Sequence, residues 1–322
     1  MSKGKVVVLG VNGHVGEAAA RAFVAAGWSV TGMARSDKQI PGVRFVRGDS
    51  DSVEDMRQAI GDARVVVNAL NMRYDQWFEG RMEAQMARVA EAMGTTGKTM
   101  LFPGNIYNYA ADSDALTPDL PQNPPTPRGA VRVRVERAFR EAAERGDMQV
   151  IILRAGDFFA PGSKGDWFDS IMMAGLKMRR IFLWGTRGIG HSWAYLPDLA
   201  RAFEALASLR STLGAFENFH FAGHYATPAE MGAAILRAAP VPLKLSRFPV
   251  IALRAYGLID PVIREVLKMY YIWRHPLRLT DARLAQLLGP GFGTPFDEAV
   301  AATVRPFFEQ AFGEAKGQVA TA

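Results

Sequence analysis

The segment KVVVLGVNGHVG, residues 5–16, joins a short apolar run to a glycine-rich turn. A continuous apolar run that ends in glycine is typical of a buried parallel strand. The alanine-rich segment EAAARAFVAAG, residues 17–27, follows with helical spacing and a terminal glycine. This order of strand, glycine-rich turn and helix is the context in which a turn binds a pyrophosphate. The segment therefore predicts a dinucleotide-binding turn, with a glycine-rich turn that holds no ligand as the alternative.

The glycines of this turn give the prediction its physical basis. Because they lack side chains, they allow a tight turn and let backbone N–H groups come close to phosphate oxygens. The N-terminus of the following helix then stabilises the negative charge. The predicted contacts are the residues of the turn and of the first helical turn, namely Gly10, Asn12, Gly13, His14, Val15 and Gly16.

The end of the second predicted strand bears on the choice of dinucleotide. A protein that binds NAD usually places an acidic residue there to hold the ribose hydroxyls. This sequence reads GMARSD at residues 32–37, with Ala34 in that place and Arg35 beside it. An arginine suits a 2′-phosphate. The sequence therefore favours NADP(H), and NAD(H) is possible if Arg35 is only solvated.

Strand and helix patterns alternate through the first half of the chain. Such alternation implies right-handed crossovers and an α/β fold with a doubly wound parallel sheet. The expected strands are 5–10, 29–34, 43–49, 63–70, 98–104 and 148–156, and the expected helices are 17–27, 52–61, 75–94 and one that starts near Thr126. A further strand, 216–223, is expected to return to the sheet.

The alternation ends near residue 160, which suggests two structural parts. We expect residues 1–160 to form a Rossmann core that binds NAD(P), with 190–222 returning to it. Residues 161–189 and 223–322 are expected to form a smaller, mostly helical C-terminal substrate lobe. No flexible linker separates the two parts.

Composition excludes several classes of function. The chain has 322 residues, 49% of them hydrophobic, and no cysteine, which excludes disulfides and thiolate metal sites. The first apolar run is too short for a signal segment or a membrane span, so a cytoplasmic protein without stable membrane insertion is expected. The net charge of +6 comes from scattered basic residues, and no element that reads nucleic acid is evident.

Several segments resemble the extended short-chain dehydrogenase/reductase superfamily, the NAD(P)-dependent epimerase/dehydratase group. They are the GxxGxxG turn, RGDSDSVEDM (47–56), VVVNALN (65–71), VIILRAGDFFAPG (150–162), HSWAYLPDLARA (191–202) and LTDARLAQLLGPGF (279–292). The resemblance covers nearly the whole chain and implies the fold and the cofactor. It places Asp49 and Ser50 at the adenine, and Asn68, Ala69 and Leu70 beside the cofactor.

The sequence departs from that family at its usual catalytic residues, which are a serine or threonine and a Tyr-x-x-x-Lys pair. The resemblance aligns Pro103 with the hydroxyl residue, Arg128 with the tyrosine and Arg132 with the lysine, while Glu136 matches the family's glutamate. The pattern resembles an atypical subgroup. Arg132 could still hold ribose hydroxyls or phosphate, and Arg128 could pair with a carboxylate or phosphate or stabilise an oxyanion. A charged helix face in solvent is the simpler alternative.

Other side chains must then transfer the proton. Tyr107 follows the fifth strand at the edge where ligands bind, and Asn105 could replace the missing hydroxyl as a hydrogen-bonding group. The predicted catalytic set is therefore Tyr107, Asn105, Arg128 and Arg132, with His191 and Tyr195 expected near the same cleft. His220 and His224 have metal-compatible spacing, but no carboxylate motif accompanies them, and no metal is expected.

These features favour an NADP(H)-dependent oxidoreductase that acts on a small, anionic or aromatic carbonyl or hydroxyl substrate. The alternatives are a sugar-nucleotide epimerase or dehydratase, as the resemblance implies, and a non-catalytic NADP(H)-binding sensor or scaffold. The segment DPVIREVLKMYYIW, residues 260–273, is amphipathic and could touch a membrane surface or a partner. The resemblance also makes a homodimer possible, paired through two helices that include the one with the arginines.

Overall fold

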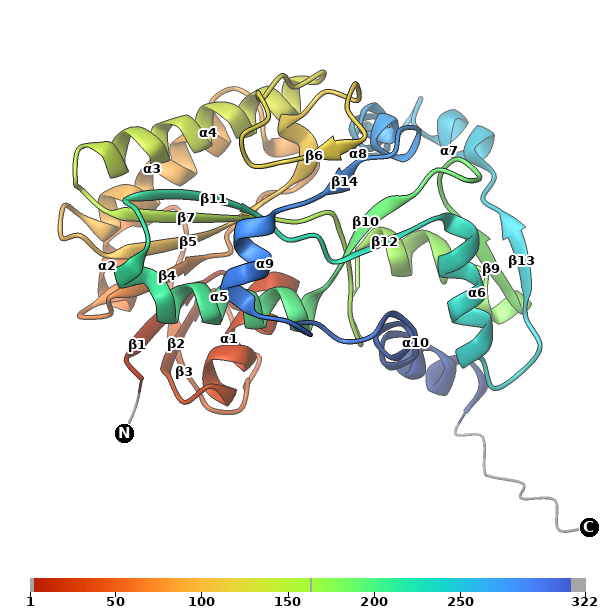
Figure 1. Ribbon diagram of the computed structural model, residues 1–322, viewed down its shortest axis with the longest axis horizontal. Coiled ribbons are helices and arrows are strands. Elements are labelled where there is room, and N and C mark those ends of the chain that lie inside the picture. The colour runs from red at the N-terminus through yellow and green to blue at the C-terminus, as the bar shows by residue number, and fades with distance from the viewer. Residues whose placement is uncertain (1–2, 163, 314–322) are drawn as a thin grey trace, which may run out of the picture.

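The computed structural model describes residues 3–162 and 164–313, and a seven-stranded parallel sheet occupies the left half of the molecule in Figure 1. The strand order is β11-β7-β5-β4-β1-β2-β3, and every neighbouring pair is parallel. The strands are β1 (Lys5–Leu9), β2 (Ser29–Ala34), β3 (Val43–Arg47), β4 (Val65–Asn68), β5 (Thr99–Gly104), β7 (Gln149–Arg154) and β11 (Phe216–His220). The predicted doubly wound sheet is confirmed, including the late strand that returns to it.

Helices cover both faces of this sheet because successive strand residues point to opposite sides. Val6 and Val8 pack with α1 (His14–Ala25) and α5 (Leu196–Leu209). Val7 and Leu9 pack on the other face, which is covered by α2 (Val53–Ile60), α3 (Arg81–Met93) and α4 (Pro127–Glu144). The inner strands β1 and β4 are therefore buried on both sides, which explains their unbroken apolar sequences.

The starts of two helices can be compared with the starts that the sequence predicts. The Thr126 hydroxyl accepts a hydrogen bond from the Gly129 N–H, and Pro127 occupies the first helical position of α4, as the sequence predicts. The helix predicted over residues 75–94 is shorter than expected. A 3₁₀ turn, η1 (Tyr74–Gln76), comes first, and α3 starts only at Arg81, because Gly80 before it has a φ of +76°.

The C-terminal lobe contains helices and short strands. A three-stranded sheet joins β8 (Asp157–Phe159), β10 (His191–Tyr195) and β12 (His224–Ala226), and two strand pairs join β9 (Arg180–Leu183) to β13 (Lys244–Arg247) and β6 (Ala115–Leu116) to β14 (Arg278–Leu279). Its helices are α6 (Pro228–Ala238), α7 (Val250–Tyr256), α8 (Pro261–Lys268), α9 (Ala282–Leu288) and α10 (Phe296–Phe312). Five further short helical turns are η2 (Ile106–Asn108), η3 (Phe168–Met172), η4 (Leu176–Met178), η5 (Arg210–Thr212) and η6 (Tyr270–Trp273).

One segment of the expected lobe lies against the core instead. Leu284 of α9 packs in the cluster that contains α1 and α5, and Arg283 forms two hydrogen bonds with Glu217 of β11. The Asp281 carboxylate accepts a hydrogen bond from the His220 N–H. Figure 1 shows α9 beside α5 and the end of β11, away from α10.

A buried ion pair joins α4 to the sheet. Arg154, at the end of β7, donates to both carboxylate oxygens of Glu136, at 2.7 and 3.2 Å. Both side chains are almost completely buried. Burial alone would raise the pKa of Glu136, but the charge and hydrogen bonds of Arg154 outweigh it and lower that pKa. Glu136 is therefore ionised at neutral pH and fixes α4 against the sheet.

Removal of one partner of the Arg154–Glu136 ion pair should lower the stability of the fold. Arg154→Met leaves the Glu136 charge buried without its counter-ion, and we expect the free energy of unfolding to fall by about 3–5 kcal/mol. Arg137→Met is the matched control, because Arg137 lies exposed on α4 next to Glu136. This substitution should change the free energy of unfolding by less than about 0.5 kcal/mol. Urea denaturation measures both variants, and equal losses would contradict the role given to the buried pair.

Candidate functional site

The three glycines of the predicted phosphate turn have different structural roles. Gly10 has a φ of +78°, and a Cβ there would lie 2.9 Å from the Ala69 carbonyl oxygen. A Cβ on Gly16 would lie 2.3 Å from the Gly10 carbonyl oxygen, so α1 could not pack as closely on the turn. Gly13 has an ordinary φ of −77°, is exposed, and its Cβ would meet only the Gly10 carbonyl oxygen at 3.4 Å. The fold therefore requires glycine at positions 10 and 16 but not at 13.

The loop after β2 is tied to this turn. The Asn12 amide donates to the Ser36 carbonyl oxygen at 2.7 Å, and the Lys38 ammonium donates to the Asn12 carbonyl oxygen at 2.6 Å. Arg35 is exposed, and its carbonyl oxygen accepts a hydrogen bond from the Arg47 side chain. The structure therefore gathers three basic side chains, those of Arg35, Lys38 and Arg47, beside the end of β2.

His14 connects the turn to the substrate lobe. Its Nδ1 lies 2.9 Å from a carboxylate oxygen of Asp166, and its Nε2 accepts a hydrogen bond from the Lys164 N–H. The hydrogen bond to Asp166 raises the pKa of His14 although partial burial opposes it. Residues 164–166 are thus held across the first turn of α1.

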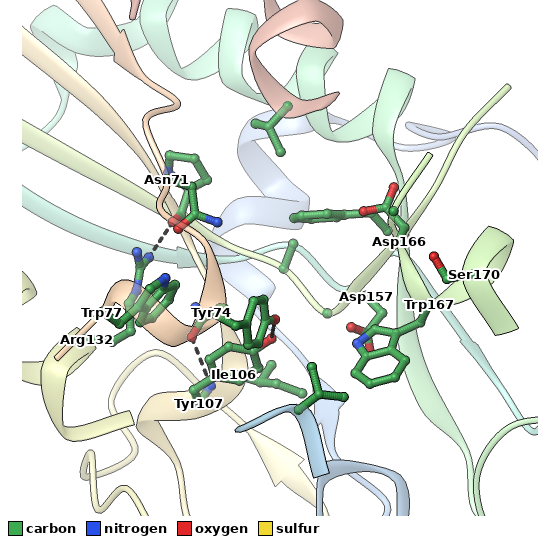
Figure 2. A pocket seen from close by; sticks show the side chains of 18 of the residues that line it. Asn71, Tyr74, Trp77, Ile106, Tyr107, Arg132, Asp157, Asp166, Trp167 and Ser170 are labelled. Atoms are coloured by element: carbon green, nitrogen blue, oxygen red, sulfur yellow. Dashed lines mark hydrogen bonds between the residues drawn. The ribbon is translucent and has the colours of Figure 1, made fainter. Parts of the chain in front are cut away.

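A cavity of about 600 Å³ opens between the carboxyl ends of the central strands and the lobe. Its wall on the core side includes Val15, Ala69, Leu70, Asn71, Tyr74, Trp77, Pro103, Asn105, Ile106, Tyr107 and Arg132. Its wall on the lobe side includes Asp157, Phe158, Asp166, Trp167, Ser170, Ile171, Phe248, Leu253, Val262, Ile263 and Val266. Figure 2 shows Tyr74, Trp77 and Arg132 facing Asp157, Asp166 and Trp167 across it. The cavity is therefore apolar over most of its lobe wall.

Two tyrosine hydroxyls meet at the core wall of this cavity. The Tyr74 and Tyr107 oxygens are 2.5 Å apart. Burial raises the pKa of Tyr107 well above its ordinary value, and burial likewise raises that of Tyr74, so both hydroxyls stay protonated at neutral pH. Since one hydroxyl donates to the other, the acceptor keeps its own proton for a further hydrogen bond.

The two predicted arginines occupy different positions. Arg132 lines the cavity and donates to the Pro103 carbonyl oxygen at 2.6 Å, and burial lowers its pKa to about 10, so it remains charged at neutral pH. Arg128 is 1% exposed and does not line the cavity. Its guanidinium lies 4.2 Å from the ring centre of Tyr74 and also faces the rings of Trp77 and Phe78.

The Arg128 guanidinium forms an ion pair with a carboxylate of the protein. Its Nη2 lies 3.5 Å from an oxygen of Glu265, on α8 of the lobe. Neither arginine belongs to a helix face in solvent, since both are buried. The Tyr74 ring lies over the Arg128 guanidinium, between residues of the core wall.

Of the other residues predicted for the site, some line the cavity and others do not. Asn105 lines the cavity, but its side-chain oxygen accepts a hydrogen bond from the Tyr107 N–H. The Asn68 side chain is fully buried and lies within 3.9 Å of the sulfurs of Met86 and Met100, so it points into the core. Asp49 and Ser50 do not line the cavity; Asp49 is exposed, and its carboxylate accepts a hydrogen bond from the Asp51 N–H.

His191 and Tyr195, which were expected near the cleft, do not line the cavity. His191 is buried behind the cavity, where its Nε2 contacts the Asp157 carboxylate and its ring stacks on Trp273. Tyr195 lines a separate groove with His220 and His224. Burial and the Arg154 charge lower the pKa of His220 to about 3, and its ring nitrogens lie within hydrogen-bond distance of Tyr109 and the Leu116 carbonyl oxygen.

Among the cavity-lining residues that sequence reasoning missed are Tyr74, Asp157 and Asp166. Tyr74 lies between the fourth predicted strand and the helix predicted over residues 75–94, where no site residue is predicted. Its place at the carboxyl end of a central strand is the signal that could have identified it, because ligands bind at that edge.

The order of the sheet, its crossovers and the glycine turn define a Rossmann-type α/β protein. The sequence matches the family described as "NAD dependent epimerase/dehydratase family" over residues 6–219. The chain belongs to that family, as the resemblance of its motifs indicated. Among curated protein sequences, none matches the chain significantly.

Solved structures of low sequence identity share the fold. MoeE5 in complex with UDP-glucose and NAD is 18% identical, with a TM-score of 0.73 over 95% of this chain and 99% of that one. UDP-glucose 4-epimerase from Brucella ovis in complex with NAD is 16% identical, with a TM-score of 0.73 over 95% and 98%. UDP-glucuronic acid 4-epimerase from Bacillus cereus in complex with NAD is 14% identical, with a TM-score of 0.74 over 97% and 99%. The whole chain therefore follows the architecture of these proteins.

The contact between His14 and Asp166 predicts a pH dependence. Because the folded-state pKa of His14 is raised above its ordinary value of 6.5, the contact stabilises the fold fully below pH 6.5 and loses its effect as pH rises through the raised pKa. We expect the His14 ring, followed by NMR, to titrate above pH 6.5 in the native protein and at lower pH in Asp166→Asn. Asp37→Asn, which removes an exposed carboxylate, is the control. A native midpoint at or below 6.5 would rule out this contact.

Proposed function

We propose that this protein binds a nicotinamide dinucleotide at the turn of Gly10–Gly16 and reduces a small carbonyl compound, or oxidises the matching alcohol, in the adjacent cavity. The observation that carries the proposal is the extent of the cavity. It reaches from Val15 and Ala69, beside the glycine turn, to the paired hydroxyls of Tyr74 and Tyr107. A dinucleotide on the turn would thus have its reactive end beside a proton donor.

The cofactor we favour is NADP(H). The exposed cations of Arg35, Lys38 and Arg47 gather where the ribose of the adenosine half would lie in a Rossmann fold, and Ala34 replaces the acidic residue typical of NAD sites. The solved structures compared above contain NAD by their titles, so NAD(H) is the alternative. Arg132, which lines the cavity as a charged group, is the candidate to contact the nicotinamide half.

The paired tyrosines supply the proton in this proposal. When bound, the dinucleotide supplies a hydride to the carbonyl carbon, and a tyrosine hydroxyl delivers its proton to the carbonyl oxygen, so that an alcohol is formed. Both tyrosines stay protonated at neutral pH because burial raises their pKa values, whereas the nearby Arg128 charge acts in the opposite sense and favours loss of the proton. The negative charge left on the tyrosine pair is stabilised by the Arg128 guanidinium against the Tyr74 ring.

The cavity wall favours an apolar or aromatic substrate over an anionic one. Trp167, Phe248 and Leu253 contribute apolar surface to the lobe side, whereas the carboxylates of Asp157 and Asp166 face the same space. Carboxylates repel a phosphate or carboxylate group and accept hydrogen bonds from hydroxyl groups. Of the substrates that the sequence favours, the aromatic carbonyl compound fits these walls best.

Two other functions make different predictions. A sugar-nucleotide epimerase is supported by the titles of the structures that share the fold, and it would convert a UDP-sugar without net consumption of cofactor. A non-catalytic sensor would bind NADPH and turn over no carbonyl compound. Both are distinguished from the oxidoreductase by the absorbance of NADPH during turnover.

The cofactor preference can be tested at Arg35. We expect Arg35→Asp to weaken NADPH binding about tenfold or more, because it removes a cation from the 2′-phosphate site, and to leave NADH binding nearly unchanged. Calorimetric titration measures both cofactors. Arg57→Asp, at an exposed arginine of α2, is the control and should bind NADPH like the native protein. Equally tight binding of NADH and NADPH by the native protein would contradict the preference.

The proton donor can be tested at Tyr107. With NADPH and a panel of aromatic ketones and aldehydes, we expect Tyr107→Phe to lower kcat by about 10²-fold or more while NADPH affinity is retained. Tyr109→Phe is the matched control, because Tyr109 is buried two residues away, contacts His220 and does not line the cavity. Native turnover that Tyr107→Phe preserves would remove Tyr107 from the mechanism, and NADPH binding without any turnover would favour the sensor.

A further inference from the structure

The helix α7 and the turn that joins it to α8 expose several large apolar side chains. Seven large apolar side chains are exposed in the described part of the chain, and four of them lie between residues 251 and 259. Ile251 is 83% exposed, Leu258 78%, Ile259 77% and Tyr256 51%. We call these four side chains the apolar tip. A contiguous exposed group of this kind marks an interaction surface more often than a random feature of a monomer.

The opposite side of the same two helices forms part of the cavity wall. Leu253 of α7 and Val262, Ile263 and Val266 of α8 all line the cavity. The segment from α7 to α8 thus carries apolar side chains toward the cavity and others toward the outside, next to Arg254. The protein covers only the side chains that face the cavity.

The segment that carries the apolar tip has more basic than acidic residues. Between residues 244 and 274 the chain has six basic residues and two acidic ones, a net charge of +4, compared with +6 for all 322 residues. Both acidic residues are engaged, since Asp260 caps α8 and Glu265 pairs with Arg128 and Lys268. Arg247 and Arg254 are exposed next to the residues that form the cavity wall.

Exposed apolar side chains next to basic residues favour one kind of binding partner. A second copy of the chain would bring two such basic segments together, which like-charge repulsion opposes. An anionic lipid surface instead accepts apolar side chains at the level of its headgroups and attracts basic residues near them. None of the helices that the structure describes is long and apolar enough to cross a bilayer.

We propose that the α7–α8 pair docks on an anionic phospholipid surface and that the cavity receives an apolar carbonyl substrate from that surface. The apolar tip enters the headgroup region, and the basic residues contact lipid phosphates. The opposite side of the same helices borders the cavity, so a lipophilic compound has a short apolar path from the surface to the tyrosines. The part that concerns the substrate rests on the proposed function, whereas the docking does not.

Sedimentation with lipid vesicles tests the docking without any cofactor. We expect the native protein to sediment with vesicles of phosphatidylcholine and phosphatidylglycerol, to remain in solution with phosphatidylcholine alone, and to release as salt rises. The double variant Leu258→Asp with Ile259→Asp should weaken binding at least tenfold, and Arg247→Gln or Arg254→Gln by about fivefold each. Met178→Asp, at a side chain 63% exposed outside the tip, is the matched control and should bind normally.

Several results would overturn the proposal. Docking through the apolar tip would be ruled out if the native protein does not bind anionic vesicles. It would also be ruled out if the double variant binds them as tightly as the control variant does. If the native protein is a dimer and the double variant is a monomer, a second copy of the chain covers the apolar tip instead. If docking is found but added vesicles do not speed the turnover of a membrane-partitioning aromatic ketone relative to a water-soluble one, the substrate part is wrong and the docking stands.

Discussion

The buried ion pair of Arg154 and Glu136 is the interaction on which the site depends. Arg154 also donates to the Asn105 carbonyl oxygen at 2.5 Å, and the Asn105 side chain in turn accepts from the Tyr107 N–H. The position of Tyr107 in the cavity is therefore set by a chain of polar contacts that starts at the ion pair. A buried charge pair holds its geometry because the loss of either partner leaves an uncompensated charge.

The arginines of α4 bear on which side chains could donate a proton in the cavity. The resemblance of the sequence motifs aligns Arg128 and Arg132 with the usual tyrosine and lysine; both arginines are buried, and an arginine cannot give up a proton near neutral pH. Arg128 instead lies against the Tyr74 ring and joins α8 through Glu265. The candidate proton donors thus come from the loops after β4 and β5, and the helix supplies positive charge beneath them.

Most of the fold could be predicted from the sequence, because strands buried on both faces give unbroken apolar runs and the glycine turn has a fixed context. The cavity was harder to predict. Tyr74 meets Tyr107, 33 residues away, and His14 meets Asp166, 152 residues away, through loops whose paths no local pattern describes. The burial of Arg128 also depends on the aromatic residues Tyr74, Trp77 and Phe78 in and directly after η1, and sequence periodicity alone could not separate that burial from exposure to solvent.

The central claim is that a dinucleotide binds the glycine turn, and Gly13 tests it most directly. The fold leaves room for a side chain at this position, so Gly13→Val should keep the native melting temperature. A valine there would stand where phosphate oxygens approach the backbone. Titration of NADPH into this variant, compared with the native protein, should show affinity reduced at least tenfold. Unchanged affinity in a folded Gly13→Val protein would contradict the account.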